Sequence, residues 1–232
     1  MSCICATSRW RMAKIVTLEQ RILKKNSEVA AENRRCFDEH GAFVVSLASS
    51  PGSGKTSLLE VALGRLRQEV AVGVIEGDVQ TDNDARRIEA LGLPAVQVVT
   101  NGTCHLDAQM VQGALEHVPF GQVELLFIEN VGNLVCPASY DLGEHLRVVV
   151  ASVTEGEDKP LKYPAMFRRS HALVLNKIDL LPYLRYDMNA ARAMALQVNP
   201  TLKIFETSCV TGEGVGEFCE WILEQMARNH AA

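Results

Sequence analysis

The chain has 232 residues, of which 47% are hydrophobic and 22% charged, and its formal net charge is −5. These values are typical of a globular protein that is large enough to bury a full core. The acidic balance and the lack of a Lys/Arg run exclude the basic surface of a nucleic-acid-binding protein. No apolar run approaches the ~20 residues that a membrane span needs, so we expect no membrane segment.

The first 13 residues are predicted to be a flexible tail, and residues 14–232 are predicted to form a single domain. The tail has no sustained apolar core of the kind found in a secretory signal. With seven cysteines and no export signal, we expect reduced thiols and a cytoplasmic protein. Cys3 and Cys5 could hold a soft metal, but a C-x-C pair is equally consistent with solvated thiols on a frayed tail.

A helical pattern comes first in the ordered part of the chain. The sequence from Thr17 to Gln20 has the form of a capping box, and apolar residues then recur at helical spacing as far as Glu39. Gly41 is a natural helix stop. Because this helix precedes the first strand, we expect it to pack on the outside of a sheet.

From Ala42 onward, apolar runs alternate with amphipathic stretches. Most runs are rich in Val, Ile and Leu and lack polar alternation, as do strands that are buried on both faces of a parallel sheet. The runs are 43–47, 71–76, 95–99, 123–129, 146–152, 172–176 and 203–206, and the helical stretches are 55–68, 82–91, 107–117, 158–169, 187–198 and 214–229. The pattern predicts an α/β fold: a doubly wound, mostly parallel sheet of about seven strands with helices on both faces.

A phosphate-binding loop follows the first run, in the sequence SLASSPGSGKTSLL. Glycines let backbone N–H groups surround phosphate oxygens at a helix N-terminus, while the lysine reaches the β- and γ-phosphates and the threonine hydroxyl binds Mg²⁺. The usual motif has glycine where this chain has Ser49. The candidate nucleotide-binding residues in the loop are Gly52, Ser53, Gly54, Lys55, Thr56 and Ser57.

Carboxylates lie at or just after the ends of two further predicted strands, 71–76 and 123–129. Asp78 lies where a magnesium shell would be completed, and we favour it over the nearby Asp82 and Asp84, although an ordinary turn residue fits the same position. Glu129 ends a buried run, and its length favours a water-mediated or catalytic role. Gly132 would let a backbone N–H meet the γ-phosphate. Lys55, Thr56, Asp78 and Glu129 are therefore the predicted catalytic residues.

A base-recognition motif, Asn176-Lys177-Ile178-Asp179, follows a later run. The carboxylate of Asp179 can accept two hydrogen bonds from guanine, whereas adenine offers no such pair of donors. Asn176 would brace the loop, and the stem of Lys177 would cover the base. Ser208 and Cys209 follow another strand, where a second base-contacting loop is expected.

Cys104, His105 and Cys136 lie in loops after two different strands. Thiolate and imidazole are ligands for zinc, nickel and copper, but one chain supplies too few of them for a closed site. Two chains about a two-fold axis would supply enough, so one hypothesis is a metal site at a dimer interface. Chemistry alone favours the alternative, in which Cys104 and Cys136 are small buried residues and His105 is a loop histidine.

Six motifs together resemble the hydrogenase nickel-incorporation GTPase, the HypB family: SSPGSGKTSLLE, EGDVQTDNDARRI, TNGTCHLDAQMV, ENVGNLVCPA, ASVTEGEDKPLKYP and LNKIDLLPY. The resemblance covers about residues 15–228. It implies a P-loop GTPase, with GTP, Mg²⁺ and Ni²⁺ or Zn²⁺ as ligands, that dimerises and helps to load nickel into [NiFe] hydrogenase. It also implies that Cys104, His105 and Cys136 are the interfacial ligands, and that Ser is normal at the Ser49 position.

The implied partners are a HypA-type nickel metallochaperone and the hydrogenase large subunit. Some family members carry an N-terminal C-x-x-C-G-C site or a histidine-rich stretch, whereas this chain has only Cys3 and Cys5 there. The related urease nickel-insertion GTPase has Cys-Pro-His, so the order Cys104-His105 favours the hydrogenase branch. A urease-type GTPase and a P-loop small-molecule kinase remain as alternatives. No side chain stands out as an activator of the attacking water, which predicts slow intrinsic turnover.

Overall fold

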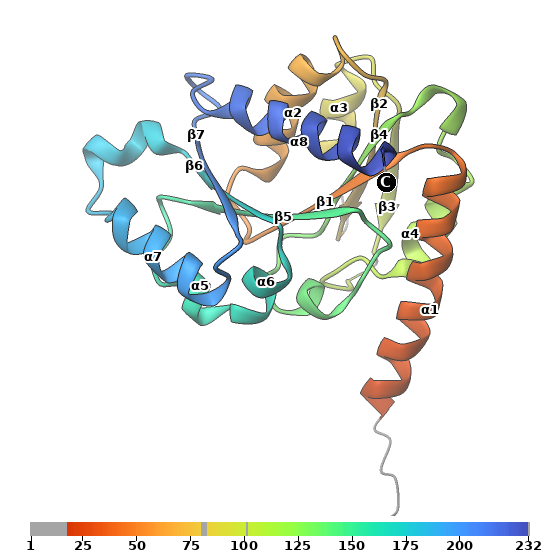
Figure 1. Ribbon diagram of the computed structural model, residues 1–232, viewed down its shortest axis with the longest axis horizontal. Helices are drawn as coiled ribbons and strands as arrows, with labels where there is room; N and C mark the ends of the chain where they lie inside the picture. Colours follow the sequence, from red (N-terminus) through yellow and green to blue (C-terminus); the bar gives the residue numbers. More distant parts are fainter. Residues whose placement is uncertain (1–17, 80–82, 101, 232) are drawn as a thin grey trace, which may run out of the picture.

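The computed structural model describes residues 18–79, 83–100 and 102–231, and the Thr17 cap and the Cys3/Cys5 pair lie outside them. Within these ranges seven parallel strands form a sheet in the order β3-β2-β4-β1-β5-β6-β7 (Figure 1). The fold predicted from the apolar runs is thereby confirmed. The strands are β1 Phe43–Ser49, β2 Val72–Asp78, β3 Ala95–Val99, β4 Leu125–Glu129, β5 Leu146–Ser152, β6 Ala172–Asn176 and β7 Lys203–Thr207.

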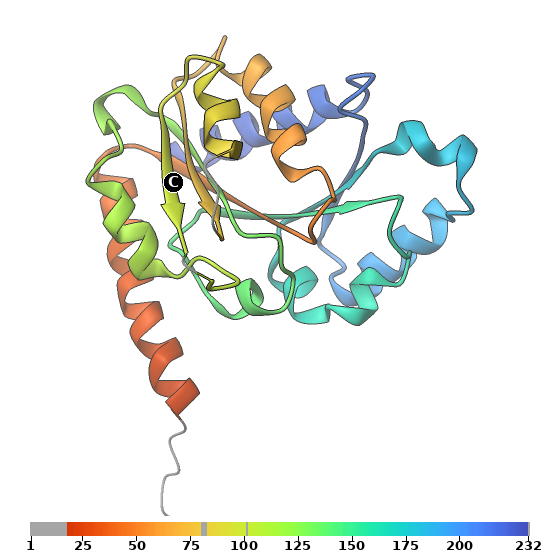
Figure 2. The same ribbon diagram turned by 180° about the vertical axis from the view of Figure 1, so that it is seen from behind.

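Helices cover both faces of this sheet. The views in Figures 1 and 2 place α2, α3 and α8 on one side and α5, α6 and α7 on the other, with α1 beside α4 at one end. The N-terminal part of α1 extends beyond the body of the domain in both views. The α-helices are α1 Leu18–Glu39, α2 Lys55–Leu66, α3 Asn83–Glu89, α4 Ala108–Leu115, α5 Lys159–Lys162, α6 Pro164–Arg169, α7 Met188–Val198 and α8 Val215–His230.

The core divides between the two faces because side chains alternate along each strand. Val45, Leu47 and Phe127 pack on the face covered by α2 and α8. Val44 and Ile128 pack on the opposite face, with α1 and α4. The Phe127 side chain is fully buried on a central strand, and truncating such a side chain to alanine costs about 3–5 kcal/mol.

One expected helix differs from the observed structure. The stretch 158–169 forms two short helices, α5 and α6, which meet at Tyr163 and Pro164. Proline has no backbone N–H to continue the first helix and restricts the residue before it, so Pro164 begins a new helix instead. In addition, β1 and β2 run two residues further than the apolar runs, to Ser49 and Asp78.

All strands are parallel, so their carboxyl ends meet at one edge of the sheet. In open α/β sheets this edge is where ligands bind. The loops after β1, β2, β4, β6 and β7 hold the predicted nucleotide residues and therefore face one region. Among the described residues, no helix is long and apolar enough to cross a membrane.

Candidate functional site

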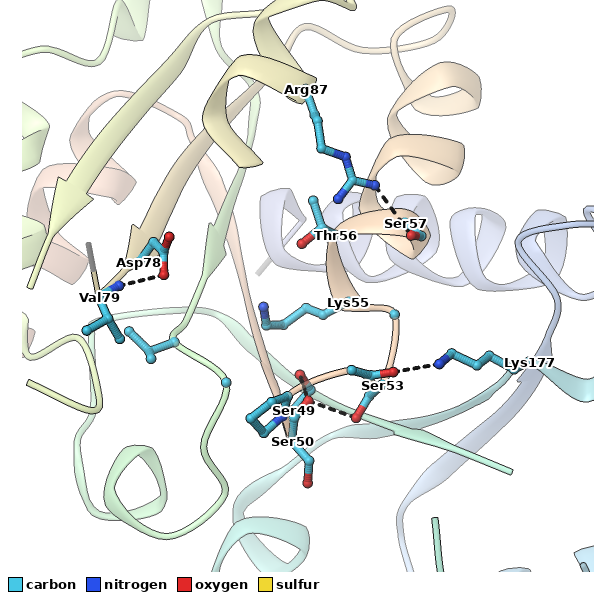
Figure 3. A pocket seen from close by; sticks show the side chains of 15 residues that line it. Ser49, Ser50, Ser53, Lys55, Thr56, Ser57, Asp78, Val79, Arg87 and Lys177 are labelled. Carbon is cyan, nitrogen blue, oxygen red and sulfur yellow. Dashed lines mark hydrogen bonds between the residues drawn. The ribbon is translucent and has the colours of Figure 1, made fainter. Parts of the chain in front are cut away.

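The phosphate-loop motif connects β1 to α2 and surrounds a cavity of about 540 Å³ (Figure 3). Helix α2 begins at Lys55, so its first N–H groups point toward the loop. Gly54 has a left-handed φ of 87°, and a Cβ there would lie 2.6 Å from Asn176 Nδ2. Both facts require glycine at this position. The loop is thus shaped by its backbone to accept an anion.

Lys55 and Thr56 line this cavity, and both contact the buried Glu129 behind them. The Lys55 ammonium donates to Glu129 Oε1, and the Thr56 hydroxyl donates to the same oxygen at 2.7 Å. Glu129 is completely buried, and its Oε2 has no hydrogen-bond partner among the described residues. A buried carboxylate oxygen without a donor fits the outer shell of a hydrated cation, so Thr56 and Glu129 together suit Mg²⁺.

Asp78, Gly132 and Ser57 lie around the same cavity. Asp78 is the last residue of β2, and its Oδ1 accepts the Val79 N–H at 2.6 Å. Gly132 lies against Pro51 of the phosphate loop. Ser57 accepts a long 3.4 Å hydrogen bond from Arg87. Arg87 belongs to the motif EGDVQTDNDARRI, but the sequence did not mark it as a site residue. Figure 3 shows Asp78 and Arg87 reaching the cavity from different elements.

The base-recognition motif is bonded directly to the phosphate loop. Asn176 Nδ2 donates to the carbonyls of Ser53 and Gly54 at 3.2 and 3.4 Å. Lys177 is the one non-glycine residue with positive φ in the described chain, at 66°, and its ammonium donates to the Gly52 carbonyl at 2.6 Å. A lysine in this left-handed conformation is uncommon, and here it turns the side chain back across the loop.

Asp179 is held by the loop after β7. The Ser208 hydroxyl donates to Asp179 Oδ1 at 2.6 Å, which fixes the orientation of the carboxylate. The Cys209 thiol donates to Asn176 Oδ1 at 3.4 Å, and burial raises the pKa of Cys209, so it stays protonated as a donor. The structure thus brings all five predicted base-side residues together.

A second group of residues supports the phosphate loop and was not assigned a role from sequence. Lys159 donates to the Ser50 hydroxyl and to Glu155 Oε1, and Ser53 donates to the same Glu155 oxygen at 3.2 Å. Glu155 and Lys159 belong to the motif ASVTEGEDKPLKYP, so the sequence contained some indication that this segment is functional. Only the folded chain shows that the loop after β5 reaches the phosphate loop.

Cys104, His105 and Cys136 form a compact cluster despite coming from different loops. Their ligand atoms all lie within 4.8 Å of one another, and the two sulfur atoms are 3.0 Å apart. Cys104 is exposed, whereas His105 and Cys136 are half-buried. Two thiols and an imidazole at this spacing are a donor set for Ni²⁺ or Zn²⁺. The structure therefore provides three of the four donors of a tetrahedral or square-planar site.

The protonation of this cluster follows from its surroundings. Burial lowers the pKa of His105, which keeps the imidazole neutral and able to bind a metal. The hydrogen bond that Cys136 shares with Cys104, followed by burial, raises the pKa of the Cys136 thiol. Metal binding must therefore displace thiol protons, as is usual for thiolate sites.

Two asparagines join the metal loops to the end of β4, and neither was selected from sequence. Asn130 Oδ1 accepts the Leu106 N–H at 3.0 Å, and Asn130 is only 4% exposed. Asn133 Nδ2 donates to the Cys104 carbonyl at 3.2 Å. Both lie in the motif ENVGNLVCPA, between Glu129 and Cys136.

Comparison with known proteins agrees with this geometry. The family model "CobW/HypB/UreG, nucleotide-binding domain" matches residues 43–206. The hydrogenase maturation factor HypB of Azotobacter chroococcum is 54% identical over 213 residues, covering 92% of this chain and 70% of that protein. This chain belongs to the HypB family.

Solved HypB structures share the fold of this family member. HypB from Helicobacter pylori in complex with nickel is 36% identical, with a TM-score of 0.85 over 88% of this chain and 96% of that one. HypB from Archaeoglobus fulgidus is 38% identical, with a TM-score of 0.82 over 88% of this chain and 99% of that one.

Proposed function

We propose that this protein is a GTP-hydrolysing metallochaperone that helps to insert nickel into [NiFe] hydrogenase, with its nucleotide state coupled to the metal cluster. The observation that carries this proposal is the path of residues 129–136. The segment begins at Glu129, which contacts Lys55 and Thr56, and ends at Cys136, which contacts Cys104. One short segment therefore contacts both the nucleotide side and the metal side.

The residues around the cavity support the proposed nucleotide chemistry. Asp179 selects guanine, and the phosphate loop holds the triphosphate with Lys55 near its β- and γ-phosphates. Water attacks the γ-phosphorus, the bond to the β–γ bridging oxygen breaks, and GDP and phosphate leave. Mg²⁺ held by Thr56, with Asp78 and Glu129 in its surroundings, would neutralise charge on the phosphates. No described side chain stands out as an activator of the water, so turnover by the isolated protein should be slow.

Nickel is the cargo in this proposal, and two copies of the chain hold it. A two-fold axis beside the cluster would let Cys104, His105 and Cys136 of a second chain supply the donor that one chain lacks. The exposed Cys104 sulfur and the neighbouring Val135, whose exposure is 62%, present a surface for such a contact. Thiols must remain reduced to act in this way, which fits a cytoplasmic protein.

The coupling works through the two asparagines of the segment. If GTP binding draws Lys55 toward phosphate, the Lys55 contact with Glu129 changes at the start of the segment. Asn130 and Asn133 transmit that change because they are bonded to the loop that carries Cys104 and His105. GTP hydrolysis would then alter the separation of the metal ligands and bias nickel release toward a partner. Such partners would be a HypA-type metallochaperone and the hydrogenase large subunit.

One experiment tests the proposal against its rivals. Hydrolysis of GTP and of ATP is compared with and without nickel, while light scattering follows the oligomeric state. We expect slow GTP-specific hydrolysis and a dimer that forms with nucleotide or metal. Rapid transfer of phosphate to an added small-molecule acceptor would instead show a kinase. Nickel binding without any GTP turnover would show a scaffold, and delivery to urease rather than hydrogenase would favour the urease-type alternative.

A further inference from the structure

Helix α1 lies against both loops that carry the metal cluster. Asn26 and Asn33 are seven residues apart in this helix, so they project from nearly the same face. Both are buried, with exposures of 8% and 1%. A buried amide without hydrogen bonds is costly, so the partners of these two side chains show which segments this face of α1 holds. The Asn33 Oδ1 has no hydrogen-bond partner among the described residues, and the Asn33 Nδ2 is bonded.

Each asparagine bridges the same two segments. Asn26 Nδ2 donates to the Asp141 carbonyl, and its Oδ1 accepts the Ala108 N–H, both at 2.8 Å. Asn33 Nδ2 donates to the carbonyls of Ala108 and Leu142 at 2.8 and 3.1 Å. Ala108 follows His105 by three residues, and Asp141 follows Cys136 by five. The two side chains therefore tie the Cys104-His105 loop to the loop that leaves Cys136.

The second loop also approaches α1 through its backbone. Gly143 has a left-handed φ of 91°, and a Cβ there would lie 2.6 Å from the Ala30 carbonyl oxygen and 2.9 Å from the Arg34 nitrogen. Arg34 Nε donates to the Gly143 carbonyl at 2.5 Å. Any side chain at position 143 would push this loop away from the helix.

We propose that α1 is the positioning element of the metal cluster, and that Asn26 and Asn33 set its metal affinity without being ligands. They set the separation of the Cys104 and Cys136 sulfur atoms seen in this structure by holding both loops to one helix. Residues that orient metal ligands from outside the coordination shell act in this way in other metal sites. The nickel part of this inference rests on the proposed function, whereas the positioning of the two thiols does not.

The first test measures the separation of the thiols without nickel. A trivalent arsenical such as phenylarsine oxide is captured only where two thiols lie together. Cys3→Ser with Cys5→Ser removes the C-x-C pair near the N-terminus. In that background we expect Asn33→Ala and Asn26→Ala to slow capture by about tenfold. Asn199→Ala is the matched control, because Asn199 is also buried and donates to two carbonyls, Phe167 and Ser170, at the opposite edge of the sheet. Capture by the control should be unchanged.

The second test titrates nickel into the same variants and follows the thiolate-to-nickel charge-transfer absorption. Asn33→Ala should lower nickel affinity by about tenfold and shift the absorption band, while GTP affinity stays the same. Gly143→Ala should act in the same direction although both asparagines remain, and unchanged GTP affinity confirms that it folds.

The outcomes separate the two proposals. If the asparagine variants match Asn199→Ala in both tests while the unaltered protein binds nickel, the positioning role of α1 is wrong and the proposed function stands. If the unaltered protein binds no nickel, the proposed function fails, and the arsenical test still decides whether α1 positions the thiols.

Discussion

The nucleotide site and the metal cluster are built in opposite ways. Loops from separate strands close the nucleotide site on one another: Asn176 and Lys177 donate to phosphate-loop carbonyls, and Ser208 fixes Asp179. Among the described residues the metal cluster has three donor atoms, one of them on an exposed residue. Hydrogen bonds from α1 and from Asn130 hold its loops.

This difference fits the proposed function. A GTP that is to be hydrolysed must be kept in register, so a site prearranged by bonds within the chain would favour it. A metal that is to be passed on requires open coordination positions, which a closed four-ligand site lacks. A cluster that lacks a fourth donor within one chain therefore suits a cargo, and the predictions below test this contrast with the nucleotide site.

The largest effect should come from removing donors of the metal cluster. Cys104→Ala combined with Cys136→Ala leaves one imidazole, so stoichiometric nickel or zinc binding should be lost, as measured by equilibrium dialysis. GTP affinity should change by less than about twofold because the altered groups are outside the nucleotide cavity. Cys36→Ala is the control, since its thiol is not part of the cluster. Full metal stoichiometry in the double variant would refute the site.

The next effect concerns base selection. Asp179→Ala removes the carboxylate that would accept two guanine hydrogen bonds, so the preference for GTP over ATP should fall by about 100-fold or more. Ser208→Ala removes only the bond that orients this carboxylate and should cost less. Competition binding with GTP and ATP measures both variants. An unchanged preference for GTP in Asp179→Ala would show that guanine is recognised elsewhere. As a control, both variants should bind nickel as tightly as the unaltered protein does.

The same contrast explains how much the sequence could predict. Local patterns placed the strands, the phosphate loop and the base-recognition motif, because apolar periodicity and glycine conformation act over a few residues. The parallel sheet then required those loops to meet at one edge. The prediction of one helix over 158–169 was wrong, because Pro164 divides this stretch into two short helices.

The hydrogen bonds that hold the loops of the metal cluster could not be predicted from local sequence patterns. Asn26 and Asn33 look like ordinary polar residues of an exposed helix, and only the fold brings them to Ala108, 82 and 75 residues away. Glu155 and Lys159 were visible in a motif, yet nothing local shows that they reach Ser50 and Ser53. Long-range hydrogen bonds of this kind depend on topology and have no pattern in a short window.

A smaller effect should follow from breaking the connection between the two sites. Asn130→Ala removes the bond to the Leu106 N–H but no ligand of either site. Nickel affinity is measured with GDP and with a non-hydrolysable GTP analogue. We expect the two affinities to differ by about tenfold in the unaltered protein and to converge in the variant. Asn199→Ala should keep the difference. If Asn130→Ala also keeps it, the coupling runs by another route.

The smallest effect should be on stability, at the amino-terminal edge of the sheet, where neither site lies. His145 Nδ1 accepts the Val44 N–H and His171 Nδ1 accepts the Arg147 N–H, both at 2.9 Å. Burial lowers the pKa of both histidines, so the unfolded chain binds protons more readily than the folded one.

The free energy of unfolding should therefore be highest above about pH 6.5, the usual pKa of histidine, and should fall as the medium becomes more acidic. Urea unfolding at about pH 7.5 and about pH 5.5 measures this slope. His145→Asn and His171→Asn place an amide oxygen where the histidine Nδ1 accepts its hydrogen bond. Asparagine is not protonated in this pH range, so the free energy of unfolding of the combined variant should change less with pH. An unchanged slope would show that these two histidines do not cause the acid sensitivity. GTP affinity at about pH 7.5 should not change in the variant, because the nucleotide is held at the opposite edge of the sheet.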